Sequence, residues 1–421
     1  MRLAIAVFLA LFFIPCFASA QILLPSVASS IKKIPIAVAV LKSSGDLSVY
    51  GKNFTDVLKS DLTNAALFDV RAVSILFSSS LEDVDFEYLN AQKTRYLVSG
   101  NFNISPKEIF YELIVYDVPA RRERMRRKYM TSAPHVRSAA HRFAGELMKE
   151  LTGLKGFFES EIVFVRKEGN ESDLFIMDYD GHNAKKLTNH GSSVLSPDCS
   201  SDGSRVIFSS DKNWDHDIYL LGFKATRLPA IGKRITRGIH LDSSPSWSPD
   251  GKHVAFSRDG EIYIASSSGE VLRRLTKSPA IDVSPTWSPD GEKIAFVSDR
   301  AGTPDIYVMS SEGGLPARIT SGGYNTDPVW SPNASVNRIA FVKVTRSRAD
   351  IYTVGPDGKG KQRLTSSGRN EHPTWSPDGY YITFSSKRRG QRQIYIMYLN
   401  GENKLPLSRG KNDSFSTWCV K

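Results

Sequence analysis

A repeated eight-residue motif constrains the fold of this chain more than any other feature. The motif reads Ser244-Pro-Ser-Trp247-Ser-Pro-Asp-Gly251, and near-identical copies begin at Ser284 and His372. Weaker copies begin at Ser196, Asp327 and Ser414. Self-similarity with a period of about 40 residues is typical of stacked or radial arrays of small units. The later part of the chain is therefore predicted to be a repeat domain.

The residues that follow each motif predict a four-stranded antiparallel unit. The Pro and Gly of the motif suit a tight turn that leads into an apolar strand. A strand with alternating burial comes next, as in Asp217-Ile-Tyr219 and Asp305-Ile-Tyr307. A short outer strand is then expected at an apolar residue followed by Thr or Ser, namely at Ile235-Thr236, Leu275-Thr276, Ile319-Thr320, Leu364-Thr365 and Leu407-Ser408.

The two ends of the repeat region complement each other. Residues 161–188 contain the three later strands of a unit with no motif before them, whereas the last motif copy, at Trp418, has nothing after it. Pairing these pieces makes one more blade and leaves no open sheet edge. The expected fold is an all-β six-bladed β-propeller closed by the C-terminal strand. An open solenoid is the alternative, and it needs capping units at its ends.

The N-terminal part of the chain has no such repeat. Arg2, an apolar run and Ala18-Ser19-Ala20 predict a cleaved signal peptide at residues 1–20, with a retained membrane anchor as the alternative. We expect a separate segment at 21–32, an α/β domain at 33–157 and the propeller at 158–421. Apolar spacing predicts a helix near 50–66. A last helix is expected near 134–151, ending at Gly153 as helices often do. Strands are expected at 33–41, 68–73, 95–104, 109–118 and 126–131.

The formal net charge is +11, and its densest basic run lies at residues 121–128. Such a run can meet an anionic partner, but no aromatic residues interleave with the arginines to stack on bases. We therefore interpret the run as the solvated tip of a hairpin.

The tryptophans of the motif are expected to fill the core between blades, because they recur at one position of every unit. Cys199 stands at the tryptophan position of its own copy, and Cys419 follows Trp418. The two cysteines should lie on adjacent inner strands with side chains on opposite faces. We expect them to be packed thiols rather than a disulfide.

Several segments resemble a known family. They are Ala140-His141-Arg142-Phe-Ala-Gly-Glu-Leu147, Leu151-Thr-Gly153 and Gly156-Phe-Phe-Glu-Ser-Glu-Ile162, followed by the repeated motif. Together they resemble the TolB family, the periplasmic component of the Tol-Pal system of Gram-negative envelopes. The resemblance implies an anticodon-binding-like α/β domain before a six-bladed propeller, with no catalysis and no cofactor. It also implies a periplasmic adaptor that links the lipoprotein Pal to the inner-membrane protein TolA, for outer-membrane integrity and cell division.

The resemblance places Pal at the mouth of the propeller channel. Three positions before the motif proline, five of six copies carry Asp or Asn, which predicts either a polar rim for a partner or a set of local Asx turns. The next two positions vary between copies, as a docking surface can. The candidate Pal-binding residues are Asp242, Ser243, Ser244, Asp282, Val283, Ser284, Asn325, Thr326, Asp327, Asn370, Glu371 and His372.

The resemblance also implies that the first residues after the signal peptide contact TolA. In this chain those residues are Gln21, Ile22, Leu23, Leu24 and Val27. The segment departs from the family patterns.

The main rival is a peptidase-related propeller protein or another envelope-binding scaffold. Propeller-linked peptidases require a Gly-x-Ser-x-Gly motif, which the sequence lacks. The lone His141 is interpreted as a packing residue. We expect no enzyme activity, no nucleic-acid partner, no membrane insertion, and a monomer.

Overall fold

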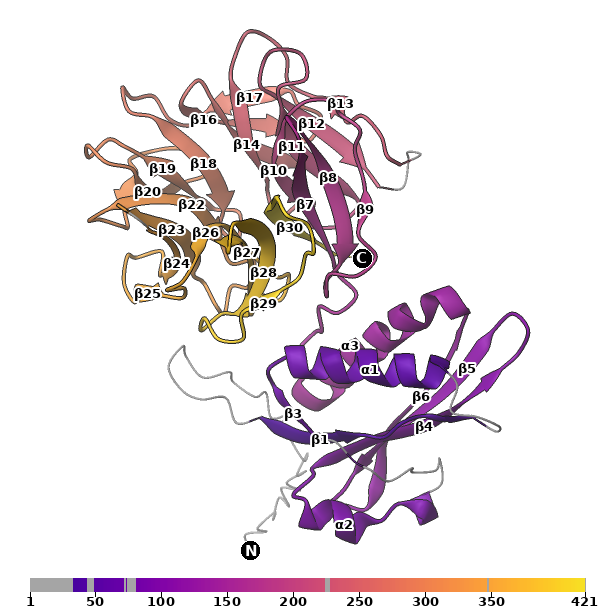
Figure 1. The fold of residues 1–421 in the computed structure, drawn as a ribbon. Coiled ribbons are helices and arrows are strands. Elements are labelled where there is room, and N and C mark those ends of the chain that lie inside the picture. The colour runs from indigo at the N-terminus through magenta and orange to yellow at the C-terminus, as the bar shows by residue number, and fades with distance from the viewer. Residues whose placement is uncertain are drawn as a thin grey trace, which may run out of the picture.

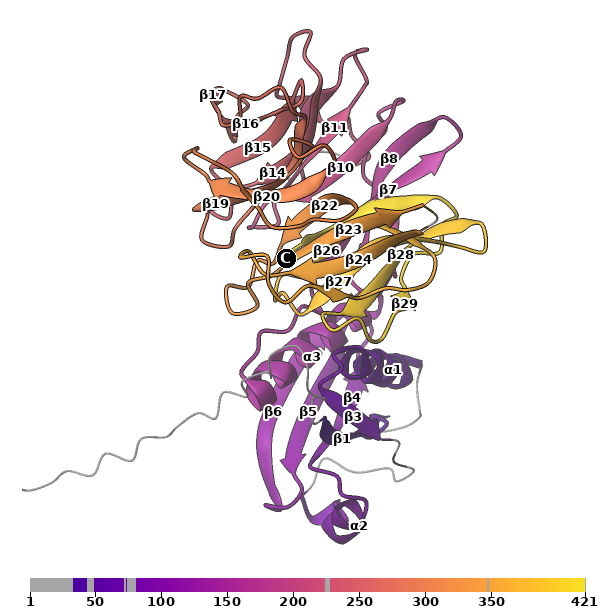
Figure 2. The ribbon, with the colours of Figure 1, turned by 90° about the vertical axis from the view of Figure 1, so that its left-hand side faces the viewer.

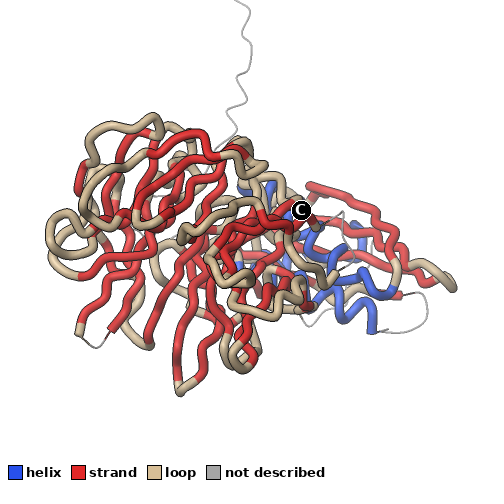
Figure 3. The backbone as a smooth tube through the Cα atoms, turned by 90° about the horizontal axis from the view of Figure 1, so that it is seen from above, coloured by secondary structure: helices blue, strands red, loops and turns tan. Residues whose placement is uncertain are grey.

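The chain folds into an α/β region followed by a six-bladed β-propeller, as predicted (Figure 1). The structure is a computed structural model that describes residues 33–43, 49–71, 73, 81–223, 228–346 and 348–420. Figure 3 shows that the helices gather in the N-terminal region, whereas the propeller consists of strands and loops. No helix in these ranges combines the length and the apolar character needed to cross a membrane.

The N-terminal region is built on one mixed sheet in the order β3-β1-β4-β5-β6. Strand β1 (Ile34–Val38) pairs in parallel with β3 (Phe68–Arg71) and with β4 (Tyr96–Ile104). Strands β4, β5 (Ile109–Asp117) and β6 (Arg122–Thr131) form an antiparallel meander, and the short β2 (Lys42–Ser43) pairs with β4.

Two long helices cover one face of this sheet, between the sheet and the propeller (Figure 2). They are α1 (Val49–Asn64), which buries Phe54 and Leu62, and α3 (Val136–Thr152), which buries Phe143. Both helices were predicted. The opposite face packs against α2 (Phe86–Ala91), which was not predicted, and short 3-10 turns lie at Leu81–Asp83 and Ala133–His135.

Residues 121–128 are solvated, as interpreted, with only Met125 buried, but the prediction that they form a hairpin tip is wrong. The turn ends at Arg121, and the rest of the run belongs to β6, an edge strand of the sheet. Several of its arginines pair with acidic residues, as Arg126 does with Glu112 at 2.8 Å and Arg127 does with Glu146 at 2.6 Å. Charged side chains on an edge strand oppose pairing with other chains, which accounts for a basic run there.

The propeller contains six four-stranded antiparallel blades, numbered here in chain order. Blade 1 is β30 (Asp413–Cys419), β7 (Glu161–Glu168), β8 (Glu171–Asp178) and β9 (Lys185–Lys186); blade 2 is β10 (Val194–Cys199), β11 (Arg205–Ser210), β12 (Asp217–Gly222) and β13 (Lys233–Arg234). Blade 3 is β14 (Asp242–Trp247), β15 (His253–Arg258), β16 (Glu261–Ser266) and β17 (Val271–Arg274); blade 4 is β18 (Asp282–Trp287), β19 (Lys293–Ser298), β20 (Asp305–Ser310) and β21 (Ala317–Arg318). Blade 5 is β22 (Tyr324–Trp330), β23 (Ile339–Thr345), β24 (Arg348–Val354) and β25 (Gln362–Arg363); blade 6 is β26 (Arg369–Trp375), β27 (Tyr381–Arg388), β28 (Gln391–Tyr398) and β29 (Leu405–Pro406).

The last strand of the chain closes the ring. Strand β30 pairs antiparallel with β7, with Asp413 opposite Arg166 and Trp418 opposite Ile162. The composite blade is thus made from the two ends of the repeat region, as the two incomplete copies predicted.

The outer strands lie about two residues earlier than predicted. The Thr residues that were expected in these strands instead follow them, and their hydroxyls bond to the start of the third strand. In blade 4 the outer strand is Ala317–Arg318, and Thr320 follows it. The Thr320 hydroxyl accepts the N–H of Ile306 at 2.8 Å and donates to Asp305 at 3.0 Å. The Arg318 side chain pairs with the same carboxylate. Blades 1, 2, 3 and 5 repeat this three-residue lock with Lys186-Thr188-Asp173, Arg234-Thr236-Asp217, Arg274-Thr276-Glu261 and Arg363-Thr365-Asp350.

The expectation of two free thiols is also wrong, because Cys199 and Cys419 form a disulfide with Cα atoms 5.4 Å apart. Their side chains do lie on opposite faces of their own blades. Opposite faces of successive blades point at each other, however, so both sulfurs enter the same apolar layer between blade 1 and blade 2. The bond joins strands that are 220 residues apart in the sequence.

The five tryptophans are buried between blades, as predicted, with 4 to 8% of each residue exposed. Trp418 also reaches the domain boundary. It packs with Phe157 at a ring-centroid distance of 5.8 Å, and Phe157 in turn packs with Tyr381 at 4.3 Å. Tyr381 donates a hydrogen bond to the carbonyl of Ala65, at the end of α1. The two regions therefore share one apolar core.

Replacing both cysteines by alanine (Cys199→Ala with Cys419→Ala) is expected to lower the free energy of unfolding of the propeller by about 2–5 kcal/mol. The reason is that the unfolded chain loses a constraint across a very long loop. Urea denaturation of the purified protein measures the change, and adding a reductant to the parent protein should reproduce it. Equal denaturation midpoints for the oxidised parent and the double variant would contradict the assigned role of the bond.

Candidate docking site at the channel mouth

One mouth of the propeller channel is ringed by six residues with left-handed backbone. Each stands two positions after the residue that is Asp or Asn in five of the six inner strands. All six have φ between 47° and 55°: Ser196, Ser244, Ser284, Asp327, His372 and Phe415. Residues other than glycine rarely adopt positive φ, and each instance costs on the order of 1–3 kcal/mol. The same conformation in every blade shows that the propeller geometry imposes it.

A β-bulge produces this conformation. The pairing of each inner strand with its neighbour shifts register at this point, for example between Ser243 and Ser246 in blade 3. The residue in front of the motif proline is thereby turned toward the channel. Its backbone N–H can bond to the preceding blade, as that of Ser284 does to the Ser257 hydroxyl at 3.1 Å. The mouth is thus held by contacts between blades.

The six residues line a cavity of 340 Å³ at this mouth, together with the prolines that follow five of them. The sequence predicted Ser244, Ser284, Asp327 and His372 as site residues, and the structure brings these four together here. The sequence prediction did not include Ser196 and Phe415, because their copies of the motif are degenerate. Their position in front of the motif proline, or of its equivalent, was the signal that could have found them.

One side of the ring carries its titratable groups. The His372 Nδ1 lies 3.1 Å from an Asp327 carboxylate oxygen, and the His372 ring stacks on Phe415 at a centroid distance of 3.6 Å. Burial raises the pKa of Asp327, but the charge of His372 and its hydrogen bonds outweigh burial and hold the pKa below its ordinary value. This part of the mouth offers a partner a carboxylate, an imidazole and an aromatic face.

The predicted polar rim of Asp and Asn residues does not exist as an exposed surface. Each of its members is at most 1% exposed, and each bonds within the propeller. Asp242 receives two hydrogen bonds from Nε and Nη2 of Arg258 at 2.6 and 2.7 Å. Asp282 receives two from Nη2 of Arg300 at 3.0 and 2.9 Å. Asn325 donates to Asp305 and Asn370 donates to Asp350. These residues fix the start of the inner strand, so neither a partner rim nor a simple Asx turn describes them.

The four remaining candidates lie between the buried and the channel-facing positions. Ser243, Val283, Thr326 and Glu371 are partly exposed and are not part of the cavity wall. Glu371 is bound by Arg369 at 2.6 Å and by Arg392 at 2.9 Å.

The channel continues to a second mouth with a different lining. This cavity of 390 Å³ is walled by the five motif tryptophans and by prolines. The two cavities share one ring of residues, in which Asp198 is the ionisable member among Ser246, Thr286, Val329, Thr374 and Thr417. Asp198 accepts the backbone N–H of Trp247 at 2.7 Å. Burial raises the pKa of Asp198 to about 6, against the lowering effect of its hydrogen bonds.

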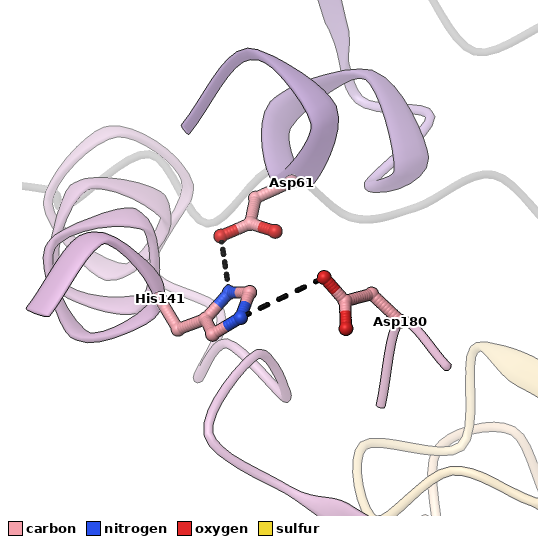
Figure 4. A group of neighbouring side chains, drawn as sticks. All are labelled: Asp61, His141 and Asp180. Atoms are coloured by element: carbon pink, nitrogen blue, oxygen red, sulfur yellow. Dashed lines mark hydrogen bonds and ion pairs between the residues drawn. The ribbon is translucent and has the colours of Figure 1, made fainter. Parts of the chain in front are cut away.

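A second polar cluster lies where the N-terminal region meets blade 1 (Figure 4). His141 of α3 is 4% exposed, and its Nδ1 lies 2.8 Å from an oxygen of Asp61, which is fully buried in α1. The His141 Nε2 faces Asp180 of blade 1 at 3.7 Å. Tyr179 donates a hydrogen bond to Asp61, and burial raises the pKa of the Asp61 carboxyl. The cluster ties both long helices to the propeller.

The ligand atoms of Asp61, His141 and Asp180 all lie within 4.8 Å, a spacing that could hold a metal ion. The carboxylate oxygens already have partners, however. Asp180 pairs with Arg137 through one oxygen and with His182 through the other at 3.2 Å. A guanidinium beside the carboxylate opposes a cation, so we assign the cluster to the domain contact. His141 is therefore a buried polar anchor rather than a simple packing residue.

The candidate TolA contacts Gln21, Ile22, Leu23, Leu24 and Val27 lie outside the described residues.

The fold and this mouth define a class of protein: an α/β domain joined to a closed six-bladed propeller with a ringed channel mouth. The profile of the family described as "TolB amino-terminal domain" matches residues 27–124, and that of the "TolB beta propeller domain" matches residues 148–421. The chain belongs to the TolB family.

Individual relatives agree with this assignment. The chain is 33% identical over 258 residues to the Tol-Pal system protein TolB of Desulfosudis oleivorans, covering 57% of each chain. It is 30% identical over 238 residues to that of Desulfotalea psychrophila, covering 56% of this chain and 52% of the relative. The chain thus spans about half the length of the curated relatives that it matches. The crystal structure of TolB from Acinetobacter baumannii superposes with a TM-score of 0.80 at 24% identity, covering 93% of this chain and 97% of that one, which supports the fold.

The Asp198→Asn variant is expected to raise the thermal midpoint at pH 8 and to match the parent protein below about pH 4. An acid whose pKa rises from 3.8 to about 6 on folding makes the folded state bind protons more tightly. The stability from this group is therefore present below pH 4 and is lost as the pH rises through 6. Asparagine keeps an acceptor for Trp247 without the buried charge.

The matched control is Asp202→Asn, in the turn that follows the same strand. Hydrogen bonds from Ser200 and Ser204 lower the pKa of Asp202 to about 2, so its replacement should lower the midpoint at pH 8. Midpoints measured from pH 4 to 8 should therefore shift in opposite directions for the two variants. A loss of stability in Asp198→Asn that is equal at all pH values would contradict this assignment.

Proposed function

We propose that the protein is a non-catalytic periplasmic adaptor of the Tol-Pal system, which docks a Pal-like peptidoglycan-associated lipoprotein at the ringed mouth. The observation that carries the proposal is the ring of left-handed residues, which opens a cavity on the channel axis of a TolB-family propeller. Backbone strain persists where the surrounding structure over-determines it, and such positions cluster at binding sites. The curated relatives that support it are described as Tol-Pal system proteins.

The proposed contact set is narrower than the one the sequence indicated. Ser244, Ser284, Asp327 and His372 face the cavity and are joined by Ser196 and Phe415. Of the other candidates, Asp242, Asp282, Asn325 and Asn370 position the strands behind the mouth. Ser243, Val283, Thr326 and Glu371 stand at its edge.

Filling the mouth should block the partner. The double variant Ser244→Arg with Ser284→Arg is expected to weaken binding of the Pal-like protein at least about tenfold, because two long side chains occupy the cavity that the partner must enter. The control is Ser201→Arg, which places the same side chain at the second mouth. Isothermal titration calorimetry with the purified mature protein measures both. Equal affinities for the blocked variant and the control would remove the mouth as the docking site.

We further propose that residues 21–32 contact a TolA-like inner-membrane protein, so that the protein links the two partners across the periplasm. Deleting residues 21–32 is expected to abolish capture of the TolA-like domain and to leave the affinity for the Pal-like protein unchanged, since the mouth lies in the propeller. A pull-down with each purified partner separates the two effects. Undiminished TolA capture by the deletion variant would assign that contact elsewhere.

A further inference from the structure

The loops around the ringed mouth differ in chemistry from one side to the other. The six ring residues share one backbone geometry, so the backbone of the ring by itself would offer a partner six similar rotational settings. The loops that lead into the inner strands, and those that join the second and third strands of each blade, surround the ring on the same face. Their side chains break the sixfold repeat.

A cationic rim lies over blades 6 and 1. It consists of five exposed side chains that form no ion pair among the described residues: Lys167, Lys387, Arg389, Arg409 and Lys411. Its loops are side by side, because the backbone N–H of Arg392 donates to the Lys411 carbonyl at 3.0 Å and that of Lys167 donates to the Asn412 carbonyl at 3.1 Å. The acids nearby are the exposed Glu168 and Glu171 and the partly exposed Glu371, which Arg369 and Arg392 bind. Positive charge therefore dominates this side of the mouth.

An apolar rim lies over blades 2 to 4. Trp214 is 99% exposed, Ile239 92%, Leu241 59% and Ile281 57%. Two hydrogen bonds join Leu241 to Asp259. The backbone N–H of Asp282, the residue after Ile281, donates to the carbonyl of Gly260 at 2.7 Å, so these loops lie side by side. The charges on this side have both signs, with Asp215 and Asp259 beside Arg237 and Lys277. Large apolar side chains this exposed mark interaction sites.

We propose that the partner docked at the mouth presents an acidic surface to the cationic rim and an apolar surface to the apolar rim, which together fix its rotation about the channel axis. This inference rests on the proposed function and adds the chemistry of the partner. Unpaired surface cations steer an acidic partner and suppress wrong orientations, whereas apolar contacts slow its dissociation. The recessed cavity between the rims favours a protein with a protruding segment over a flat membrane surface, which cannot fill it.

The test compares two triple charge reversals of the mature protein. The rim variant is Lys387→Glu, Arg389→Glu and Lys411→Glu, and the control is Lys252→Glu, Lys293→Glu and Lys361→Glu, three exposed lysines at the opposite end of the blades. Both sets change the net charge equally. The probe is the purified periplasmic domain of the Pal-like lipoprotein from the same organism. At low salt the rim variant should lose about tenfold or more in association rate, with a weaker salt dependence, and the control should change less than about twofold.

The apolar rim is tested by Ile239→Ser with Leu241→Ser. This double variant should dissociate about tenfold faster while its association rate stays close to that of the parent protein. Equal rates for the parent, the rim variant and the control would overturn the inference and leave the proposed function standing. Absence of binding by the parent itself would overturn both. Loss of binding to phosphatidylglycerol vesicles in the rim variant, with unchanged affinity for the protein probe, would overturn the inference in favour of a membrane contact.

Discussion

The pairing of β30 with β7 is the interaction on which the rest of the structure depends. It joins the two ends of the repeat region into blade 1 and removes the open edges that a six-unit array would otherwise have. The disulfide between Cys199 and Cys419 reinforces the same seam by linking blade 2 to the closing strand. The salt bridge of Arg166 with Asp413 lies at the mouth end of this pairing. Closure is therefore held by backbone hydrogen bonds, a covalent bond and an ion pair together.

Closure also explains how the mouth can carry six unfavourable backbone conformations. A residue such as Ser284 is fixed on one side by the bulge in its own blade and on the other by a hydrogen bond to the preceding blade. In an open array the terminal blades would lack one of these neighbours. The cavity at the mouth is thus a property of the complete ring. The buried cluster of Asp61, His141 and Asp180 fixes the N-terminal region to the same closing blade.

The repeat made the propeller predictable, since each blade needs the same turn and the same tryptophan position. The helix α2 (Phe86–Ala91) was missed because six residues are too few for a clear helical period. The disulfide was missed because it depends on which faces of successive blades meet. The channel-facing position of Ser244 follows from a register shift between two strands, which no local pattern reports. The contacts of His141 join distant parts of the chain, so its spacing in the sequence carried no signal.

Native-state hydrogen exchange tests most directly whether ring closure governs the propeller. If β30 and β7 hold the ring, their amides should exchange only through global opening, with the same high free energy as the amides in the middle of blade 4. Reduction of the disulfide should then lower the protection of all blades together. Local exchange of β30 at a much lower free energy, with the other blades still protected, would contradict the account.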